Sequence, residues 1–451
     1  MSSEETMLKR ELGLGYATFF GVGLILGAGI YVLIGRTANF SGDAIWASVL
    51  FGAVIALATA FSFAELTSMY PRASSTHLFV KSALPKRDDI AFITAWLLYF
   101  SGVCGGATAA IGFSRYLIAL IKWELAWVPI VTIILLILLS FINWWGIKES
   151  ALVTLIFTFI EMSGLVFIIL LALFLPQRSP NFFAVNPSLD PFLGVLLGAA
   201  VFYFAYTGFE LQPTLSEETI DARRTVPKAI ILAIIICSVL YLLVSLAVVV
   251  LLDWRALAAS PAPLADAAYH AWKPAYFLLM FIALFSTFNT ALGFLVTSSR
   301  LVYGLAEEKA IHPGLMQVHP TRRTPHVAVF LTGLLAIVVI VLTEVLPMMT
   351  GISVQIGAIK YELIDLVGKT ASLAVILTFI MVNISAIILR YTRPDDERPF
   401  RMPLSIGKFP LLPAIATAMC FFFIITSFLE WIIWLTTILV IAIGLILYRA
   451  R

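Results

Sequence analysis

Gly21–Ile30 reads GVGLILGAGI and Phe202–Glu210 reads FYFAYTGFE, so two strongly apolar segments carry glycine at their centres. A helix in hydrocarbon keeps its backbone N–H and C=O groups paired internally, because each unpaired group costs several kcal/mol. Central glycines therefore indicate that both helices are broken. Breaks at matching places in two halves of a membrane chain indicate a binding site at the bilayer midplane.

The composition places the chain in a membrane. Of its 451 residues, 61% are hydrophobic and 12% are charged, whereas soluble domains carry roughly 25% charged residues. The net charge of +3 is small and scattered, so the expected partners are membrane lipid and a small solute, not nucleic acid. The three cysteines lie in apolar segments, and no disulfide or metal framework is expected from them.

Apolar windows of about 20 residues predict twelve transmembrane helices, hence an all-α integral membrane protein. An even number of spans places both termini on one side. That side carries 21 of the 29 Lys and Arg residues and the opposite side carries 6, so the positive-inside rule predicts cytoplasmic termini. No organelle-targeting segment is recognised, which favours a cell membrane. The predicted spans are 13–36, 42–70, 90–120, 126–145, 150–175, 191–217, 227–252, 270–304, 326–346, 363–390, 410–429 and 431–449.

The first break offers backbone groups that match a zwitterion. Unwinding at Gly27 would leave the amides of Ala28, Gly29 and Ile30 at the start of a second half-helix, where the helix dipole favours a carboxylate. Carbonyls at the end of the first half would suit an ammonium group. A close-packing glycine face is an equally good interpretation of this segment alone. The second break favours the interpretation as a substrate site over a close-packing face.

The second break carries aromatic and acidic side chains. Phe204 is interpreted as a lid over a bound solute, and the carbonyls of Phe204 and Thr207 as partners of its ammonium group. Simple packing of the rings is the alternative. Glu210 lies inside a predicted span, where an ionisable residue is costly and indicates function.

These stretches resemble the amino acid–polyamine–organocation (APC) superfamily of permeases, along nearly the whole chain. The resemblance implies a LeuT-like fold, which is one membrane domain with a five-plus-five inverted repeat, discontinuous helices 1 and 6, and two C-terminal helices. The parts are then a cytoplasmic tail at 1–12, repeats at 13–175 and 191–390, and the last two helices at 410–449. The motifs that carry it are GVGLILGAGIYVLIG, FAELTSMYPRAS, FAYTGFE, EETIDARRTVPKAI, ALFSTFNTALGFLVTSSRLVYGLAEE and RPDDERPFRMPL.

The resemblance also implies secondary active transport of amino acids by alternating access, with no enzymatic activity and no cofactor. It places the carboxylate of the substrate on the amides already named and adds the carbonyl of Ile25 to the ammonium site. Small, uncharged lining residues favour neutral L-amino acids. The predicted substrate-binding residues are Ile25, Gly27, Ala28, Gly29, Ile30, Cys104, Phe204, Tyr206, Thr207, Gly208 and Asn289.

Glu161 departs from the family pattern, in which Lys often stands at this place in helix 5. In those relatives the Lys cation replaces a sodium ion between helices 1, 5 and 8. A buried Glu161 is expected to be protonated or to hold a cation with the hydroxyls of Ser286 and Thr287. These hydroxyls could equally bond to their own helix. Another alternative pairs Glu161 with Arg115 or Lys369.

Acidic residues are predicted to couple transport to an ion and to form a gate. We hypothesise that Glu161 or Glu210 titrates during transport, which makes H⁺ the driving ion, with Na⁺ as an open alternative. Glu65, near the end of helix 2, is expected to organise an inner gate, or else to face water. The five histidines lie in or next to loops without ligand spacing, so no metal site is expected.

Several alternatives stay open at this point. A cationic amino acid or polyamine transporter, or an amino acid exchanger, would use the same backbone site. A channel or a membrane receptor would be a different class of protein. The sequence does not decide between a monomer and a homodimer.

Overall fold

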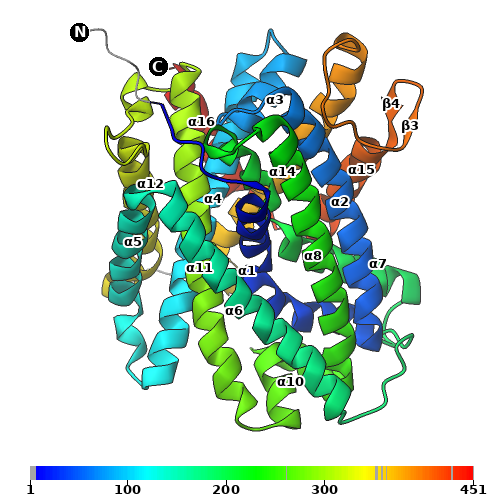
Figure 1. Cartoon of the computed structure of the whole chain (residues 1–451). Coiled ribbons are helices and arrows are strands. Elements are labelled where there is room, and N and C mark those ends of the chain that lie inside the picture. The colour runs from blue at the N-terminus through cyan, green and yellow to red at the C-terminus, as the bar shows by residue number, and fades with distance from the viewer. Residues whose placement is uncertain are drawn as a thin grey trace.

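The computed structural model describes residues 7–260, 262–350, 354–356, 359–361, 363–427 and 430–449. The side chain of Ala28 lies outside this description. Within the described chain, ten helices are long and apolar enough to cross a membrane, and two shorter apolar helices accompany them. The protein is therefore an all-helical membrane protein (Figure 1).

The first half of the chain runs through helices that match the first five predicted spans. A short helix, α3, follows α2 in a segment predicted as a connector. The elements are α1 (Leu14–Ser41), η1 (Gly42–Ala44), α2 (Ile45–Met69), α3 (Ser75–Ala83), α4 (Asp88–Ile121), η2 (Leu125–Trp127), α5 (Val128–Trp145) and α6 (Ile147–Phe174).

The second half begins with a span divided into three pieces, α7 (Pro191–Phe202), η3 (Tyr203–Tyr206) and η4 (Phe209–Glu218). Further helices follow to the end of the described chain. They are α8 (Ala222–Leu251), α9 (Trp254–Ala259), α10 (Pro263–Ala271), α11 (Ala275–Glu307), η5 (Pro313–Met316), α12 (His326–Ile340), the π-helical η6 (Val341–Val345), α13 (Leu346–Thr350), α14 (Leu363–Thr392), α15 (Leu411–Ser427) and α16 (Trp431–Arg449).

Two small antiparallel pairs of strands complete the fold. One pair joins β1 (Val354–Ile356) to β2 (Ile359–Tyr361), and the other joins β3 (Ser405–Ile406) to β4 (Phe409–Pro410).

The predicted span at 270–304 was wrong at its start. It joins the end of α10 to α11, whereas the structure separates them at Trp272–Pro274. Proline lacks an N–H group and restricts the residue before it, so the helix stops and restarts here. The division of the chain into two inverted repeats stays a prediction.

The broken helix α1 lies at the centre of the bundle and contacts α6, α7, α8 and α11 (Figure 1). Large apolar side chains point outward on the peripheral helices, as a bilayer requires; examples are Ile134 on α5, Leu334 on α12 and Ile446 on α16. The two ends of the described chain lie on one side of the bundle, which we call the terminal side (Figure 1).

Candidate functional site

The predicted break in α1 is present at Gly27. Its backbone angles, φ 17° and ψ −167°, are not helical, although the residues on both sides are. The helix therefore consists of two halves, Leu14–Gly27 and a second half that starts near Gly29. A side chain at Gly27 would meet Thr290 of α11, because an added Cβ would lie 2.6 Å from its Oγ1.

The predicted break in the second segment extends from Tyr203 to Gly208. After α7, one 3₁₀ turn leads to Thr207 in an extended conformation and to Gly208 with φ 122°. This backbone conformation strongly favours glycine. A 3₁₀ turn has three residues per turn, so residues three apart share a face. Tyr203 and Tyr206 accordingly point into the core, while Phe204 and Thr207 are both half-buried.

The two breaks touch each other through their backbones. A Cβ added to Gly208 would lie 2.6 Å from the carbonyl oxygen of Leu24, and one added to Gly29 would lie 3.1 Å from Cα of Ala205. The glycines thus allow non-helical backbone from two segments about 180 residues apart in sequence to meet. Such backbone is tolerated at membrane depth only where it is buried in protein or lines a cavity.

Tyr241 of α8, which no sequence motif indicated, joins the two breaks. Its hydroxyl lies 2.8 Å from the carbonyl oxygen of Ile25, 3.2 Å from that of Leu26 and 3.1 Å from that of Ala205. One hydroxyl proton is therefore shared among carbonyls of both broken segments. The only available signal was a tyrosine in the middle of an otherwise apolar span.

Tyr241→Phe is expected to weaken the site while keeping the ring. Several buried carbonyls lose their donor, and each unsatisfied group costs about 1–3 kcal/mol. We expect a lower melting temperature in detergent and slower substrate uptake. Tyr391→Phe is the control, because that side chain is exposed. Equal behaviour of the two variants would show that the Tyr241 hydroxyl does not hold the breaks together.

The predicted ammonium acceptors already have partners within the protein. Ile25 O accepts from Tyr241, and Phe204 O accepts from the hydroxyl of Thr207 at 2.8 Å and from its N–H at 3.2 Å. Each carbonyl has two lone pairs, so Ile25 O retains acceptor capacity. The hydroxyl of Tyr206, predicted to line the site, lies 3.3 Å from the carbonyl of Val49 and is directed into the core.

The other predicted lining residues lie on α4 and α11. Asn289 is buried and donates to the hydroxyl of Thr158 at 3.0 Å. Both side chains abut Gly23 in the first half of α1, where an added Cβ would lie 2.4 Å from Thr158 Oγ1. Cys104 is buried on α4, next to glycines that pack against Phe294 of α11.

Glu210 supports the backbone of the second break. Its side chain is 1% exposed, and Oε2 accepts the N–H of Gly208 at 2.7 Å. The carboxyl group therefore satisfies an amide that the broken helix leaves without a helical partner. Gln212, two residues further on, donates to the carbonyl of Ala17 at 2.9 Å and ties η4 to the first half of α1.

Glu161 lies on α6 and is fully buried. Its Oε1 accepts from the hydroxyl of Ser286 at 2.5 Å, while Oε2 has no hydrogen-bond partner among the residues that the structure describes. The hydroxyl of Thr287 instead lies 2.8 Å from the carbonyl of Ala283 in its own helix. The structure thus brings Glu161 and Ser286 together and directs Thr287 elsewhere.

The alternative in which Glu161 pairs with Arg115 or Lys369 is not what the structure has, because both cations pair with other carboxylates. Arg115 lies 3.7 Å from Glu344, and Lys369 lies 2.7 Å from Glu430. Within the described ranges, no group of three or more His, Cys, Asp or Glu side chains is arranged to hold a metal ion.

Comparison with known proteins assigns this arrangement to a family. Residues 12–448 match the amino acid permease family, which covers both breaks and nearly all the helices. The chain belongs to this family. It is therefore an amino acid transporter and not an enzyme.

Individual relatives of this permease are distant. The branched-chain amino acid permease BcaP of Bacillus subtilis (strain 168) is 25% identical over 470 residues, covering 99% of this chain and 94% of the relative. Cationic amino acid transporter 4 of Mus musculus is 28% identical over 416 residues, covering 87% and 61% respectively. The methylthioribose transporter of Bacillus subtilis (strain 168) is 24% identical, covering 99% and 94%.

Glu65 joins α2 of the permease to the end of α14 on the terminal side. It is 2% exposed and lies 2.5 Å from Arg390 and 3.2 Å from Arg398. Its Oε2 also accepts the N–H of Met402 at 2.8 Å. The alternative in which Glu65 faces water is therefore wrong, because a buried ion-pair network surrounds it.

A second buried network joins η4 to α11 on the terminal side. Glu218, at the end of η4, pairs with Arg300 of α11 at 2.9 Å, and both side chains are 0% exposed. Arg300 also donates to the side-chain oxygen of Asn143. The N-terminal segment adds backbone bonds here, since the N–H of Leu12 donates to the carbonyl of Glu218 at 3.0 Å.

The turn after α2 packs tightly against α11. The turn contains Ser74–Ser75, and Ser75 adopts a positive φ of 23°. A Cβ on Gly304 would lie 2.2 Å from the backbone nitrogen of Ser74. The N–H of Ala73 in this turn donates to Glu217 of η4 at 3.1 Å. The turn thus connects α2, η4 and α11 on the terminal side.

Proposed function

We propose that this permease carries neutral L-amino acids by proton-coupled alternating access, with the substrate held between the two breaks. The observation that carries the proposal is the backbone contact between the breaks, where Gly208 meets Leu24 and Gly29 meets Ala205. Half-helix ends present amides to a carboxylate and carbonyls to an ammonium group. These backbone groups recognise what all amino acids share.

The acidic residues near the breaks already make hydrogen bonds within the protein, which favours a substrate with a neutral side chain. Glu210 is bonded to the backbone of the break, and Glu161 lies on α6 against Ser286. The other described side chains at the breaks, Thr207, Tyr241 and Thr290, are uncharged. The likeness to a branched-chain amino acid permease supports the same proposal.

A cationic amino acid is the second candidate substrate. The likeness to a cationic amino acid transporter favours it, as does the second oxygen of Glu161, which is buried without a hydrogen-bond partner in the described structure. A cationic side chain reaching this carboxylate would be stabilised strongly at low dielectric.

A ligand-stabilisation screen separates the two candidates. Leucine, isoleucine and alanine are expected to raise the melting temperature of the purified permease, because ligands that bind only the folded state stabilise it. Arginine, lysine and putrescine should have no such effect. Stabilisation by the cations alone would refute the neutral-substrate proposal and favour the second candidate.

We propose that Glu161 couples substrate transport to proton movement. A fully buried carboxyl group next to Ser286, with no cationic partner among the described residues, is stable in the membrane only when it carries a proton or another cation. Glu161 also lies close to α1, because its neighbours Thr158 and Asn289 contact Gly23 in that helix. Movement of α1 would then change the surroundings of this group.

Glu161→Gln is expected to abolish the dependence of uptake on a proton gradient. The amide keeps the shape and can still accept from Ser286, but it cannot release a proton near neutral pH. Uptake by variant proteoliposomes should be the same with and without the gradient, while exchange across the membrane continues. Glu124→Gln is the control, because Glu124 is exposed. Full retention of gradient dependence by Glu161→Gln would remove Glu161 from this role.

The terminal side is proposed to be the cytoplasmic side, and its ion networks the inner gate. The pair between Glu218 and Arg300 connects η4 to α11, and the pair between Glu65 and Arg390 connects α2 to α14. Opening toward the cytoplasm would separate these elements and hydrate the charges. A gate of this kind suits the alternating access of a transporter.

A further inference from the structure

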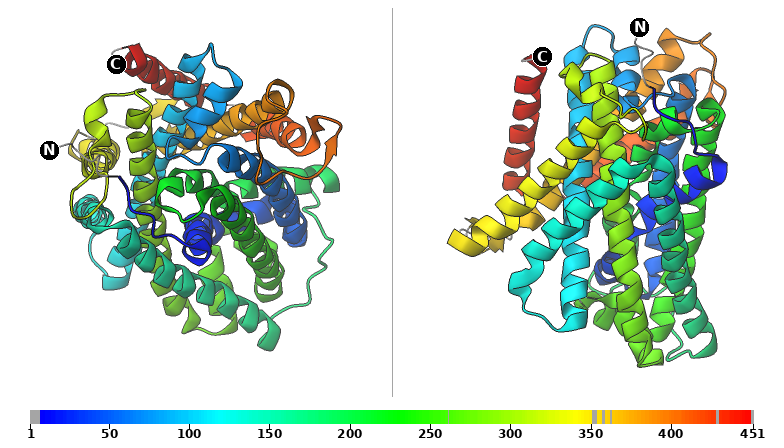
Figure 2. Two further views of the ribbon diagram at one scale, coloured as in Figure 1. Left: turned by 45° about the horizontal axis from the view of Figure 1, so that its top comes forward. Right: turned by 60° about the vertical axis from the view of Figure 1, so that its left-hand side comes forward.

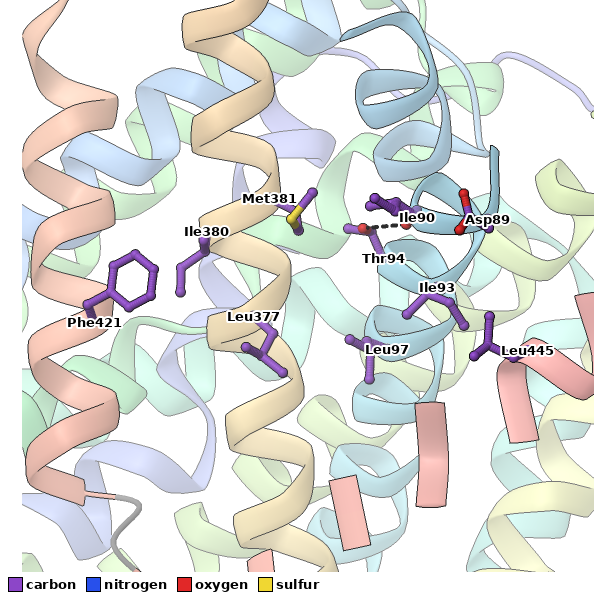
Figure 3. A pocket seen from close by; sticks show the side chains of 10 residues that line it. All are labelled: Asp89, Ile90, Ile93, Thr94, Leu97, Leu377, Ile380, Met381, Phe421 and Leu445. Atoms are coloured by element: carbon purple, nitrogen blue, oxygen red, sulfur yellow. Dashed lines mark hydrogen bonds between the residues drawn. The ribbon is translucent and has the colours of Figure 1, made fainter. Parts of the chain in front are cut away.

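A groove on the outer surface of the bundle is lined by none of the residues assigned to the breaks. It has a volume of about 390 Å³ and runs between α4, α14, α15 and α16. Figure 3 shows side chains of α4 facing those of α14, with Phe421 of α15 and Leu445 of α16 at the two edges. Nearly all of its lining is hydrocarbon, and Asp89 is the one charged residue in it.

The walls of the groove are anchored independently of any occupant. On one side, the indole of Trp96 on α4 donates to the carbonyl of Val440 at 2.9 Å, and Gly444 of α16 packs closely against the same ring. On the other side, the ring of Phe423 on α15 packs at a tilt against the ring of Tyr203, with ring centroids 4.8 Å apart. The helices therefore hold the groove open, so that it does not close by simple repacking.

The rim of the groove on the terminal side is basic. Asp89, in the first turn of α4, is paired with Arg87 through two bonds of 2.9 Å, which neutralises its charge. Lys86 is exposed beside this pair. Arg449 is exposed in the last turn of α16, one turn beyond Leu445 on the same face. The rim thus carries Lys81, Lys86, Arg87 and Arg449 against Asp88 and Asp89, which is an excess of two cations.

We propose that this groove binds an anionic phospholipid from the leaflet on the terminal side. One acyl chain lies along Leu97, Leu377 and Met381, and the phosphate lies near Lys86 and Arg449. Because the groove is lined almost entirely by hydrocarbon, a flexible acyl chain is a suitable occupant. Basic sites between helices at the cytoplasmic surface favour anionic headgroups.

The experiment uses the purified full-length permease in mixed micelles and counts bound lipid by native mass spectrometry. The probes are dioleoyl phosphatidylglycerol, dioleoyl phosphatidylcholine, dioleoylglycerol and glycerol phosphate. We expect one phosphatidylglycerol per chain, retained roughly 30-fold better than phosphatidylcholine, or about 2 kcal/mol, because two basic residues lie near the proposed phosphate position. Glycerol phosphate, which has the head group and no chains, should not bind.

Two sets of variants test the contributions of the groove and of its basic rim to lipid binding separately. Met381→Trp fills the groove and should lower phosphatidylglycerol retention roughly tenfold, or about 1.4 kcal/mol. Leu445→Trp tests the same point from the opposite wall if Met381→Trp folds poorly. The double variant Lys86→Gln/Arg449→Gln should reduce phosphatidylglycerol to the level of phosphatidylcholine. Leu334→Trp on α12 and Lys148→Gln at the start of α6 are exposed controls.

Three results would overturn the proposal. Retention by both tryptophan variants at the level of the controls would show that the chain does not occupy the groove. Equal retention of the two phospholipids would show that the basic rim does not select an anionic headgroup. Binding of glycerol phosphate alone would show a free-phosphate site instead of a lipid site.

Discussion

Gly208→Ala is expected to reduce substrate uptake at least about 100-fold, which corresponds to about 2.7 kcal/mol. The residue has φ 122°, which L-residues rarely adopt, and an added Cβ would lie 2.6 Å from the carbonyl oxygen of Leu24. The neighbouring atom is backbone, so α1 itself would have to move. Because this contact joins the two breaks, the displacement would disrupt the proposed binding geometry directly.

Gly15→Ala is the matched control for this prediction. Gly15 lies in the first turn of the same broken helix α1, and an added Cβ there would have no atom within 4 Å. We expect uptake near that of the unmodified protein. Rates would be measured in proteoliposomes at equal protein content. Near-normal uptake by Gly208→Ala would show that the close backbone contact is not required.

Arg300→Met is expected to destabilise the permease by about 3–5 kcal/mol, because it leaves the buried carboxylate of Glu218 without its partner. Both side chains are 0% exposed, and two bonds of 2.9 and 3.1 Å join them. Removing one member of such a pair is more costly than removing both. Unfolding in mild detergent, followed by tryptophan fluorescence, would measure the loss.

The double variant Arg300→Met/Glu218→Leu supplies the decisive comparison. It leaves no unpaired buried charge, so it should recover a large part of the lost stability. Arg223→Met is the control, because Arg223 pairs with Glu397 at an exposed site and little change is expected there. If Arg300→Met resembled Arg223→Met, the buried pair would not be a structural closure of the terminal side.

The spans and the two breaks could be predicted because their causes are local. Hydropathy over about 20 residues reflects the bilayer, and a central glycine reflects the freedom of its own backbone. The same locality explains the error between α10 and α11, where a window of apolar residues passed over Lys273–Pro274.

Contacts between distant segments could not be predicted in the same way. Tyr241 is separated from Ile25 by 216 positions, and no local pattern indicates which carbonyl its hydroxyl will meet. Arg300 is one of the 21 cations on the predicted cytoplasmic side and lies at the end of the predicted span 270–304, yet it is fully buried with Glu218. Charge counting detects where cations are placed and gives no information about their partners.

Where two adjacent residues were both predicted to belong to the site, the helix geometry determines which of them contacts the other site residues. Consecutive residues on an α-helix do not face the same neighbour, so Ser286 reaches Glu161 while Thr287 bonds within α11. In the 3₁₀ turn of the second break, Tyr206 follows Tyr203 into the core and Phe204 shares a face with Thr207. The predicted role of Phe204 as a lid remains a prediction.

Uptake of radiolabelled leucine and arginine into proteoliposomes tests the central claim most directly. The vesicles would be assayed with and without an inward proton gradient. The account predicts that leucine accumulates above its external concentration only with the gradient, and that excess unlabelled arginine does not compete. Accumulation of arginine in place of leucine, or leucine accumulation that ignores the gradient, would contradict it.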